Sequence, residues 1–148
     1  MKNVFKSMPC VVRNIVGAPE LLIFQHPHAG IQIPKGTVEP GETIASAAWR
    51  ELEEETGVTA VRLLRPIGQW ARVCGAGPDE ARPLEKHLWE LFLFEPTADL
   101  GNAWEHTITA LGIEQGMRVQ CHWLPLAAKS LARLNPVFQD AFKMVMAA

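Results

Sequence analysis

The stretch of residues 36–58, GTVEPGETIASAAWRELEEETGV, constrains this chain more than any other part of its sequence. Four glutamates fall within five residues near its end, and like charges at helical spacing destabilise a helix unless a positive charge lies against them. Residues 40–41, Pro-Gly, are typical of a turn, and Gly57 is a residue type that commonly ends a helix. We therefore predict a helix that begins at Glu42 or Thr43 and closes at Gly57.

Helical spacing separates the glutamates into two groups. At about 100° per residue, one apolar stripe runs along the helix: Ile44, Ala45, Ala48 and Leu52. Glu51, Glu54 and Glu55 are three and four residues apart and converge at the edge of this stripe. Glu53 points towards solvent, and Arg50, four residues before Glu54, is placed to hold that carboxylate.

Three convergent, half-buried carboxylates are a poor device for stability, because each raises the cost of ionising the others. They suit a hard divalent cation such as Mg²⁺ or Mn²⁺, which prefers oxygen ligands. Because Mg²⁺ is commonly bound by one or two carboxylates together with substrate phosphates, the cluster indicates phosphate chemistry.

The same stretch resembles the Nudix box, which reads G, five residues, E, seven residues, R-E-U-x-E-E-x-G-U, with U aliphatic. Every fixed position is filled: Gly36, Glu42, Arg50, Glu51, Leu52, Glu54, Glu55, Gly57 and Val58. The competing interpretation is an acidic amphipathic surface helix, which nine constrained positions disfavour. The resemblance implies the Nudix fold, an α/β fold with a mixed β-sheet sandwiched between helices (α/β/α), over a single domain of residues 1–148.

The resemblance also implies an activity, the metal-dependent hydrolysis of a diphosphate (pyrophosphate) bond in a nucleoside diphosphate linked to another moiety. In that activity Glu51, Glu54 and Glu55 hold the Mg²⁺ or Mn²⁺ ions. Gly36 and Glu42 belong to the same metal site, where Gly36 lets the backbone bend and Glu42 gives support from the helix start.

The catalytic residues implied by the resemblance are Glu51, Glu54 and Arg50. Glu51, or a glutamate outside the box, deprotonates the attacking water, and Arg50 orients the box glutamates. The chemistry fits these roles, since a metal that bridges phosphate oxygens neutralises developing charge.

Residues outside the box supply further candidates for substrate binding. Lys35 precedes the box, where it either faces the phosphates as a point charge or is solvated. Glu105 and Glu114 lie in the long segment of residues 95–116, and some family members use an extra acidic residue from a distal loop; the alternative is a pair of surface carboxylates. His26 and His28 are interpreted as ordinary loop residues, because no metal-ligand spacing accompanies them.

Composition limits the partners of the chain. The net charge is −2 with no basic run, so a DNA or RNA duplex is not expected, and no apolar run is long enough to cross a membrane. Three scattered cysteines without a CxxC pattern favour reduced thiols and a cytoplasmic location. The expected partner is a small-molecule nucleotide, and a homodimer stays open.

Apolar periodicity outside the box predicts a strand-rich chain. Strands are expected at residues 4–16, 20–25, 31–33, 58–65, 67–73, 85–94 and 117–124. Residues 74–83 are predicted as a loop, and residues 95–116 as an irregular segment with a turn of helix within 104–111. A final amphipathic helix is expected over residues 126–146, broken or kinked at Asn135–Pro136.

Substrate choice stays the most open question at this level. Residues 34–36, Pro-Lys-Gly, resemble the box entrance of polyphosphate-cleaving members, which favours a nucleoside triphosphate or a dinucleoside polyphosphate. The proline that suggests ADP-ribose is missing near residues 74–76, and the chain has no tyrosine. Trp70, Trp89 and Trp104 are available for stacking, although core packing is the commoner use of tryptophan. A non-catalytic nucleotide-sensing module and an isopentenyl-diphosphate-isomerase-like enzyme rank lower, because the box is complete.

Overall fold

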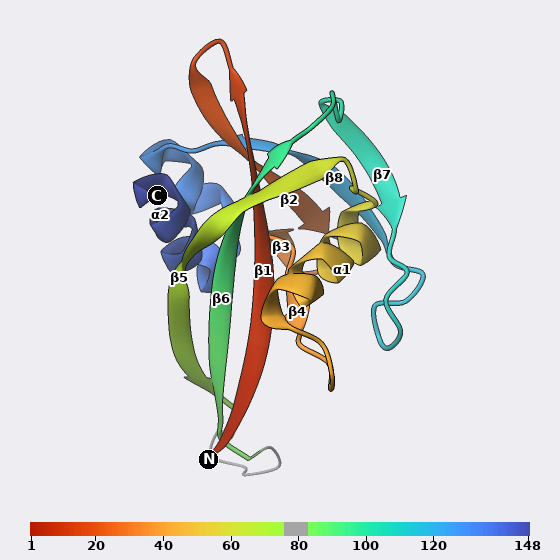
Figure 1. The fold of residues 1–148 in the computed structure, drawn as a ribbon, viewed down its shortest axis with the longest axis vertical. Helices are drawn as coiled ribbons and strands as arrows, with labels where there is room; N and C mark the ends of the chain where they lie inside the picture. The colour runs from red at the N-terminus through yellow and green to blue at the C-terminus, as the bar shows by residue number, and fades with distance from the viewer. Residues whose placement is uncertain (76–82) are drawn as a thin grey trace.

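The computed structural model of this chain describes residues 1–75 and 83–148 (Figure 1). Its strands are β1 Lys2–Ile15, β2 Ala18–His26, β3 Gly30–Gln32, β4 Gly36–Thr37, β5 Val61–Cys74, β6 Glu85–Pro96, β7 Ala103–Thr107 and β8 Arg118–Pro125. Its helices are α1 Ile44–Thr56 and α2 Gln139–Ala147, with two 3-10 segments, η1 Ala128–Arg133 and η2 Pro136–Phe138. None of the helices in the described ranges is long and apolar enough to cross a membrane.

The strands form one mixed sheet in the order β5-β6-β1-β2-β8-β7, with β3 added to β2 and β4 added to β1. The long strand β1 makes it mixed: its first part runs parallel to β6, whereas its end pairs with β2 as an antiparallel hairpin. β4 pairs with the middle of β1, and the chain enters α1 shortly after it. The stretch of residues 36–58 therefore begins at the centre of the sheet.

The two helices cover opposite faces of the sheet (Figure 1). Strand alternation sends Leu21 and Ile23 into the cluster that contains Phe142 of α2. The neighbouring residues, Leu22 and Phe24, instead join the cluster that contains Ala48 and Leu52 of α1. All seven of these side chains are at most 1% exposed. The predicted α/β/α arrangement and the predicted apolar stripe of the box helix are both confirmed.

The strand that follows the box differs from the prediction. The two strands expected at residues 58–65 and 67–73 are one strand, β5, with register shifts between Leu63 and Arg65 and between Pro66 and Gly68. β5 lies at the edge of the sheet and pairs with a strand on one side only. A proline is tolerated there, because its missing N–H can face the unpaired side of the strand. Pro66 therefore interrupts the register without ending the strand.

The turn of helix expected within residues 104–111 is wrong. Ala103–Thr107 forms β7, which pairs antiparallel with β8 from Ala103 opposite His122 to Thr107 opposite Arg118. Trp104 and His106 are half-buried and their neighbours are exposed, which is the two-residue period of a strand. Pairing with β8 stabilises this segment as a strand and not as a helical turn.

The C-terminal segment is also less regular than predicted. In place of one helix over residues 126–146, η1, η2 and α2 follow one another. The expected break at Asn135–Pro136 is confirmed, because the Asn135 side chain accepts a hydrogen bond from the Val137 N–H (3.0 Å) at the start of η2. The predicted loop of residues 74–83 falls largely on residues 76–82, which lie outside the described residues.

Candidate active site

Local hydrogen bonds fix the ends of the helix α1. Thr43 accepts a hydrogen bond from the Ser46 N–H (3.0 Å), and the Ser46 hydroxyl accepts one from the Thr43 N–H (3.1 Å), which completes a capping box. Gly57 ends the helix with φ 77°, in the left-handed region that glycine adopts without strain. Both ends agree with the prediction. These limits determine which side chains of α1 face the adjoining pocket.

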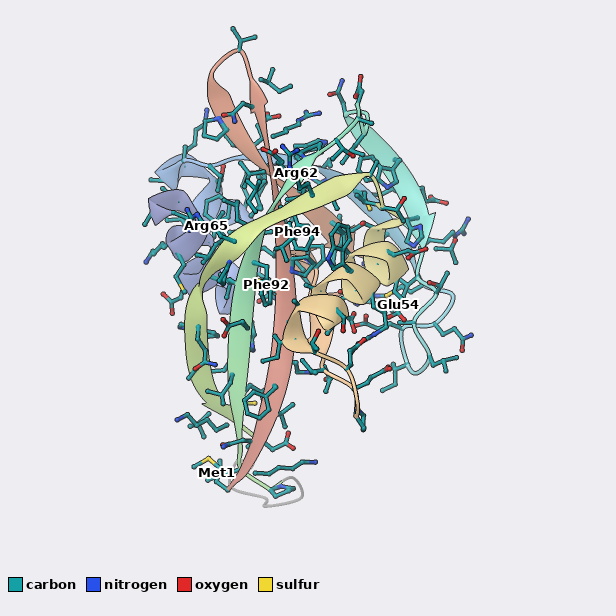
Figure 2. All side chains as sticks on the ribbon, in the orientation of Figure 1. Met1, Glu54, Arg62, Arg65, Phe92 and Phe94 are labelled. Carbon is teal, nitrogen blue, oxygen red and sulfur yellow. The ribbon has the colours of Figure 1, made fainter. Side chains whose placement is uncertain are left out.

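The pocket lies between α1 and the segment of residues 108–116, with a volume of about 720 Å³. Its wall includes Glu51, Glu54 and Glu55 from α1, and Figure 2 shows Glu54 projecting from the helix on the side that faces this segment. Lys35 and Gly36 line the pocket from the chain just before the helix. Gly36, Arg50 and the three glutamates therefore share one cavity with Lys35, whereas Glu42, which was also predicted at the metal site, is not among the lining residues.

Glu51 and Glu55 are carboxylates held largely out of solvent, at 7% and 5% exposure. Burial raises the pKa of Glu51, and the nearby Arg50 guanidinium partly opposes this effect. The pKa of Glu55 is raised well above its ordinary range, first by burial and then by the negative charge of Glu51. The Lys35 backbone N–H donates a hydrogen bond to Glu55 Oε1 (2.8 Å). Positive charge in the pocket would favour the ionised form of both groups.

Arg50 binds the glutamates around it. It donates to both carboxylate oxygens of Glu42 (2.7 and 2.9 Å) and, through Nη1, to Glu51 (2.8 Å) and Glu54 (3.0 Å). Hydrogen bonding to Arg50 lowers the pKa of Glu42, and the same bonds raise the pKa of Arg50. Its Nη2 also donates to the Thr37 carbonyl (3.0 Å). Arg50 thus ties the helix to β4 and orients three carboxylates, as a bidentate guanidinium can.

Gly36 touches the pocket at its most crowded point. A Cβ atom at this position would collide with the carboxylate of Glu51. Its φ is not in the left-handed region, so the close approach of Glu51 is the reason that a side chain does not fit here.

The carboxylates of the pocket are candidate ligands for a divalent cation. Within residues 1–75 and 83–148, no three His, Cys, Asp or Glu side chains converge on a common point that would hold a metal. Arg50 Nη1 lies between Glu51 and Glu54 and provides the positive charge there. Glu51, Glu54 and Glu55 nevertheless line one pocket and supply carboxylate oxygens, the ligand type that a hard divalent cation prefers, so their chemistry fits such an ion.

Lys35 is the cation of the pocket that approaches aromatic rings. Its Nζ lies 4.9 Å from the ring centroid of Trp89 and 5.6 Å from that of Phe138. Burial, and next the positive charge of Lys6, lower the pKa of Lys35. Lys6 also lines the pocket. An anionic group in the pocket would be attracted by both ammonium groups.

The two acidic candidates outside the box are separated by the fold. Glu114 lines the pocket, and its Oε1 lies 4.0 Å from Nε2 of His26. Glu105 lies on β7, where it accepts a hydrogen bond from the Gln120 side chain (2.9 Å) and pairs with Arg118 (3.8 Å). Glu105 is not among the residues that line the pocket.

The residues matched by the NUDIX domain family run from 6 to 143. The chain belongs to the Nudix family. An RNA pyrophosphohydrolase from Brucella ovis is 51% identical to this Nudix chain over 39 residues, which are 26% of the chain and 22% of that protein. One from Caulobacter vibrioides is 39% identical over 77 residues, or 47% of the chain and 45% of that protein. The matched segments thus span less than half of the length of these relatives.

Solved structures resemble the whole Nudix chain. A Caenorhabditis elegans Ap4A hydrolase, crystallised as a binary complex, aligns with a TM-score of 0.65 at 18% identity and covers 97% of this chain and 96% of its own. A MutT protein from Methanosarcina mazei aligns with a TM-score of 0.63 at 20% identity, over 96% and 91% of the two chains. At this identity they show that the fold is the Nudix fold.

The Nudix chain also contains contacts that sequence reasoning missed. Nε2 of His106 lies 2.9 Å from the Glu54 carbonyl, which also accepts a hydrogen bond from the Thr109 N–H (3.2 Å). Trp104 Nε1 donates to the Thr56 carbonyl (2.8 Å). These groups satisfy the last carbonyls of α1, which have no partner within the helix. No local pattern predicts them, because about fifty residues separate the partners.

The three tryptophans considered for stacking have other surroundings. Trp89 is 1% exposed and packs edge-on against Trp70, with ring centroids 4.8 Å apart. Trp104 is bound to the end of α1, as described above. None of the three is among the residues that line the pocket of the Nudix box. Their contacts described here are with other residues of the protein, and not with that pocket.

Proposed function

We propose that this chain is a metal-dependent hydrolase that cleaves a diphosphate bond in a nucleoside diphosphate linked to another moiety. We further propose that a single domain, residues 1–148, carries this activity. One observation carries the proposal: the three box carboxylates and Lys35 line a single pocket of about 720 Å³. Carboxylates and ammonium groups that line the same pocket suit a phosphate chain accompanied by a cation.

Glu51, Glu54 and Glu55 are the groups proposed to hold Mg²⁺ or Mn²⁺. Gly36 leaves room for the Glu51 carboxylate, and Glu42 keeps Arg50 in place through two hydrogen bonds. When bound, the cation would neutralise charge on the phosphate oxygens and acidify the attacking water.

The remaining roles fall to groups that reach the same space. Glu51 or Glu114 accepts the proton of the water while the water oxygen bonds to phosphorus and the anhydride P–O bond breaks. Lys35, a half-buried ammonium whose pKa burial lowers, pairs with a phosphate oxygen and offsets the charge of the departing phosphate. Glu105 is left out of this proposal, because it lies on β7 and is bound to Gln120 and Arg118.

The substrates that we favour carry more than two phosphates, namely nucleoside triphosphates and dinucleoside polyphosphates. Support comes from the Pro-Lys-Gly entrance and from Lys6, which adds a second ammonium to the pocket wall. The relatives named RNA pyrophosphohydrolase add the 5′-triphosphate end of an RNA to the candidates. The three cysteines, all in the described residues, are free thiols, which suits a cytoplasmic site of action.

A substrate panel tests the proposal. Nucleoside triphosphates, dinucleoside polyphosphates, a 5′-triphosphorylated RNA oligonucleotide, ADP-ribose and nucleotide sugars would each be incubated with Mg²⁺, with Mn²⁺ and with EDTA, and phosphate or nucleotide release measured. We expect cleavage of a polyphosphate substrate that EDTA abolishes. Tight nucleotide binding by calorimetry without any cleavage would instead support the alternative, a Nudix-fold sensing module.

A further inference from the structure

Two large apolar side chains stand in solvent at the rim of the pocket. Leu111 is 89% exposed and Ile113 is 100% exposed, and both line the pocket that the box glutamates line. Single exposed apolar residues are common on proteins. Here two of them line the same cavity as the box glutamates, and exposed apolar groups beside a groove are a mark of ligand contacts.

The segment that carries these side chains is held at its base. Ile108 is 1% exposed, and its carbonyl accepts a hydrogen bond from the Gly116 N–H (2.9 Å). The Thr109 N–H donates to the Glu54 carbonyl at the end of α1 (3.2 Å). The segment is therefore hydrogen-bonded to the end of α1, so Leu111 and Ile113 line the pocket from a segment with a fixed base.

The two walls of the pocket differ in chemistry. Glu51, Glu54, Glu55 and Lys35 line one wall, and the polyphosphate of the proposed substrate belongs there. Leu111 and Ile113 have no polar side-chain atom, so they would only repel a phosphate by desolvating it. A molecule that fills the pocket therefore needs one charged end and one apolar end.

We propose that Leu111 and Ile113 contact the nucleobase of the substrate and set how strongly a nucleotide is preferred over a bare polyphosphate. The inference rests on the proposed function, since it takes the phosphates to lie against the box. Leu and Ile offer apolar area without hydrogen-bond donors or acceptors, so the binding free energy from this contact increases with the size of the base. Purine nucleotides gain more from it than pyrimidine nucleotides, and the contact reads no base edge.

The test compares a nucleotide analogue with a polyphosphate of the same number of phosphates that lacks the base and the ribose. Binding of an ATP analogue with methylene groups in place of its bridging oxygens, and of inorganic tripolyphosphate, would be measured by calorimetry in Mg²⁺. For the Leu111→Ser, Ile113→Ser double variant, we expect the Kd of the analogue to rise about tenfold, while the Kd of tripolyphosphate stays within about twofold. The matched control is Ile15→Ser, Val16→Ser, since these side chains are also exposed (46% and 101%) but lie at the hairpin between β1 and β2.

Each other result overturns the inference. Equal weakening of both ligands would mean that the two residues shape the segment and do not touch the base. Unchanged binding of the analogue, or an unmodified protein that binds the analogue no better than tripolyphosphate, would exclude a base contact. Failure of the proposed function gives a separate result: the unmodified protein would bind the analogue yet cleave no nucleotide.

Discussion

The two walls of the pocket are built in different ways. The wall formed by α1 is specified within 23 residues, where the capping box of Thr43 and Ser46 and the hydrogen bonds of Arg50 all connect near neighbours in the sequence. The wall formed by residues 108–116 is held by a few backbone hydrogen bonds at its base and presents exposed side chains. The first wall is suited to fixed chemistry, and the second to contacts that differ among substrates.

The two walls also differ in their charged side chains. The α1 wall holds two buried carboxylates, Glu51 and Glu55, whose pKa values burial raises, and the Arg50 guanidinium binds the first of them. The other wall offers one acidic side chain, Glu114, which is 46% exposed. Substitutions in the α1 wall should therefore affect the chemical step most, and substitutions in the other wall should affect it less.

The largest effect is expected from Glu51→Gln and Glu54→Gln. Each replaces a pocket carboxylate by a neutral amide of the same shape, so turnover should fall on the order of a thousandfold while the helix persists. Turnover by single-turnover assay and folding by circular dichroism measure this. Glu53→Gln, a change at an exposed residue of the same helix, is the control and should keep full activity. Unchanged turnover in both pocket variants would contradict the assignment of the site.

A smaller loss is expected from Gly36→Ala. The added methyl group would collide with the Glu51 carboxylate and displace it, and a displacement of about 1 Å can cost about a hundredfold in rate. The measurement is kcat together with the melting temperature. In the control, Gly68→Ala, the new Cβ meets only the flexible end of Met144 at 3.1 Å, away from the pocket. If Gly36→Ala lost stability but kept kcat, the close contact would be structural only.

In the wall formed by residues 108–116, Glu114 is the single carboxylate, and Glu114→Gln tests whether it takes part in catalysis. We expect kcat to fall about tenfold, because Glu114 lines the pocket and assists from outside the box. Glu105→Gln provides the matched control: it removes a carboxylate from the neighbouring strand β7, outside the pocket, and should leave kcat unchanged. Equal effects of the two variants would mean that the division between the acidic residues is wrong.

The smallest effect concerns pH and stability. Because the folded-state pKa of Glu55 is raised, its contribution to the free energy of unfolding is fully present below the ordinary value of 4.5 and is lost as pH rises through the folded pKa. Without divalent cations, the melting temperature of the parent should therefore fall with pH by a few degrees relative to Glu55→Gln. Adding Mg²⁺, which favours the ionised form, should reduce the difference. Parallel curves for the two proteins in EDTA would contradict the raised pKa.

Much of this fold could be read from local patterns. The alternation of apolar residues predicted β1, β2, β3, β6 and β8, and the glycine and proline signals predicted the hairpin and the break at Asn135. The errors fall where partners are distant in sequence. β5 was divided at Pro66 because the pattern does not tell an edge strand from a central one. β7 was missed because five residues of weak alternation become a strand only when β8 lies beside them.

The sequence by itself determined the box helix, its two ends, its buried stripe and the carboxylates on its edge. The physical reason is that caps, helical spacing and the bonds of Arg50 act over a few residues and need no distant partner. Only the tertiary structure decided that Glu114 reaches the pocket while Glu105 does not, and that Lys35 lies against Trp89 and Phe138. Those arrangements depend on strand pairing and core packing between segments that are distant in the chain, and neither leaves a signal in the residues taken one stretch at a time.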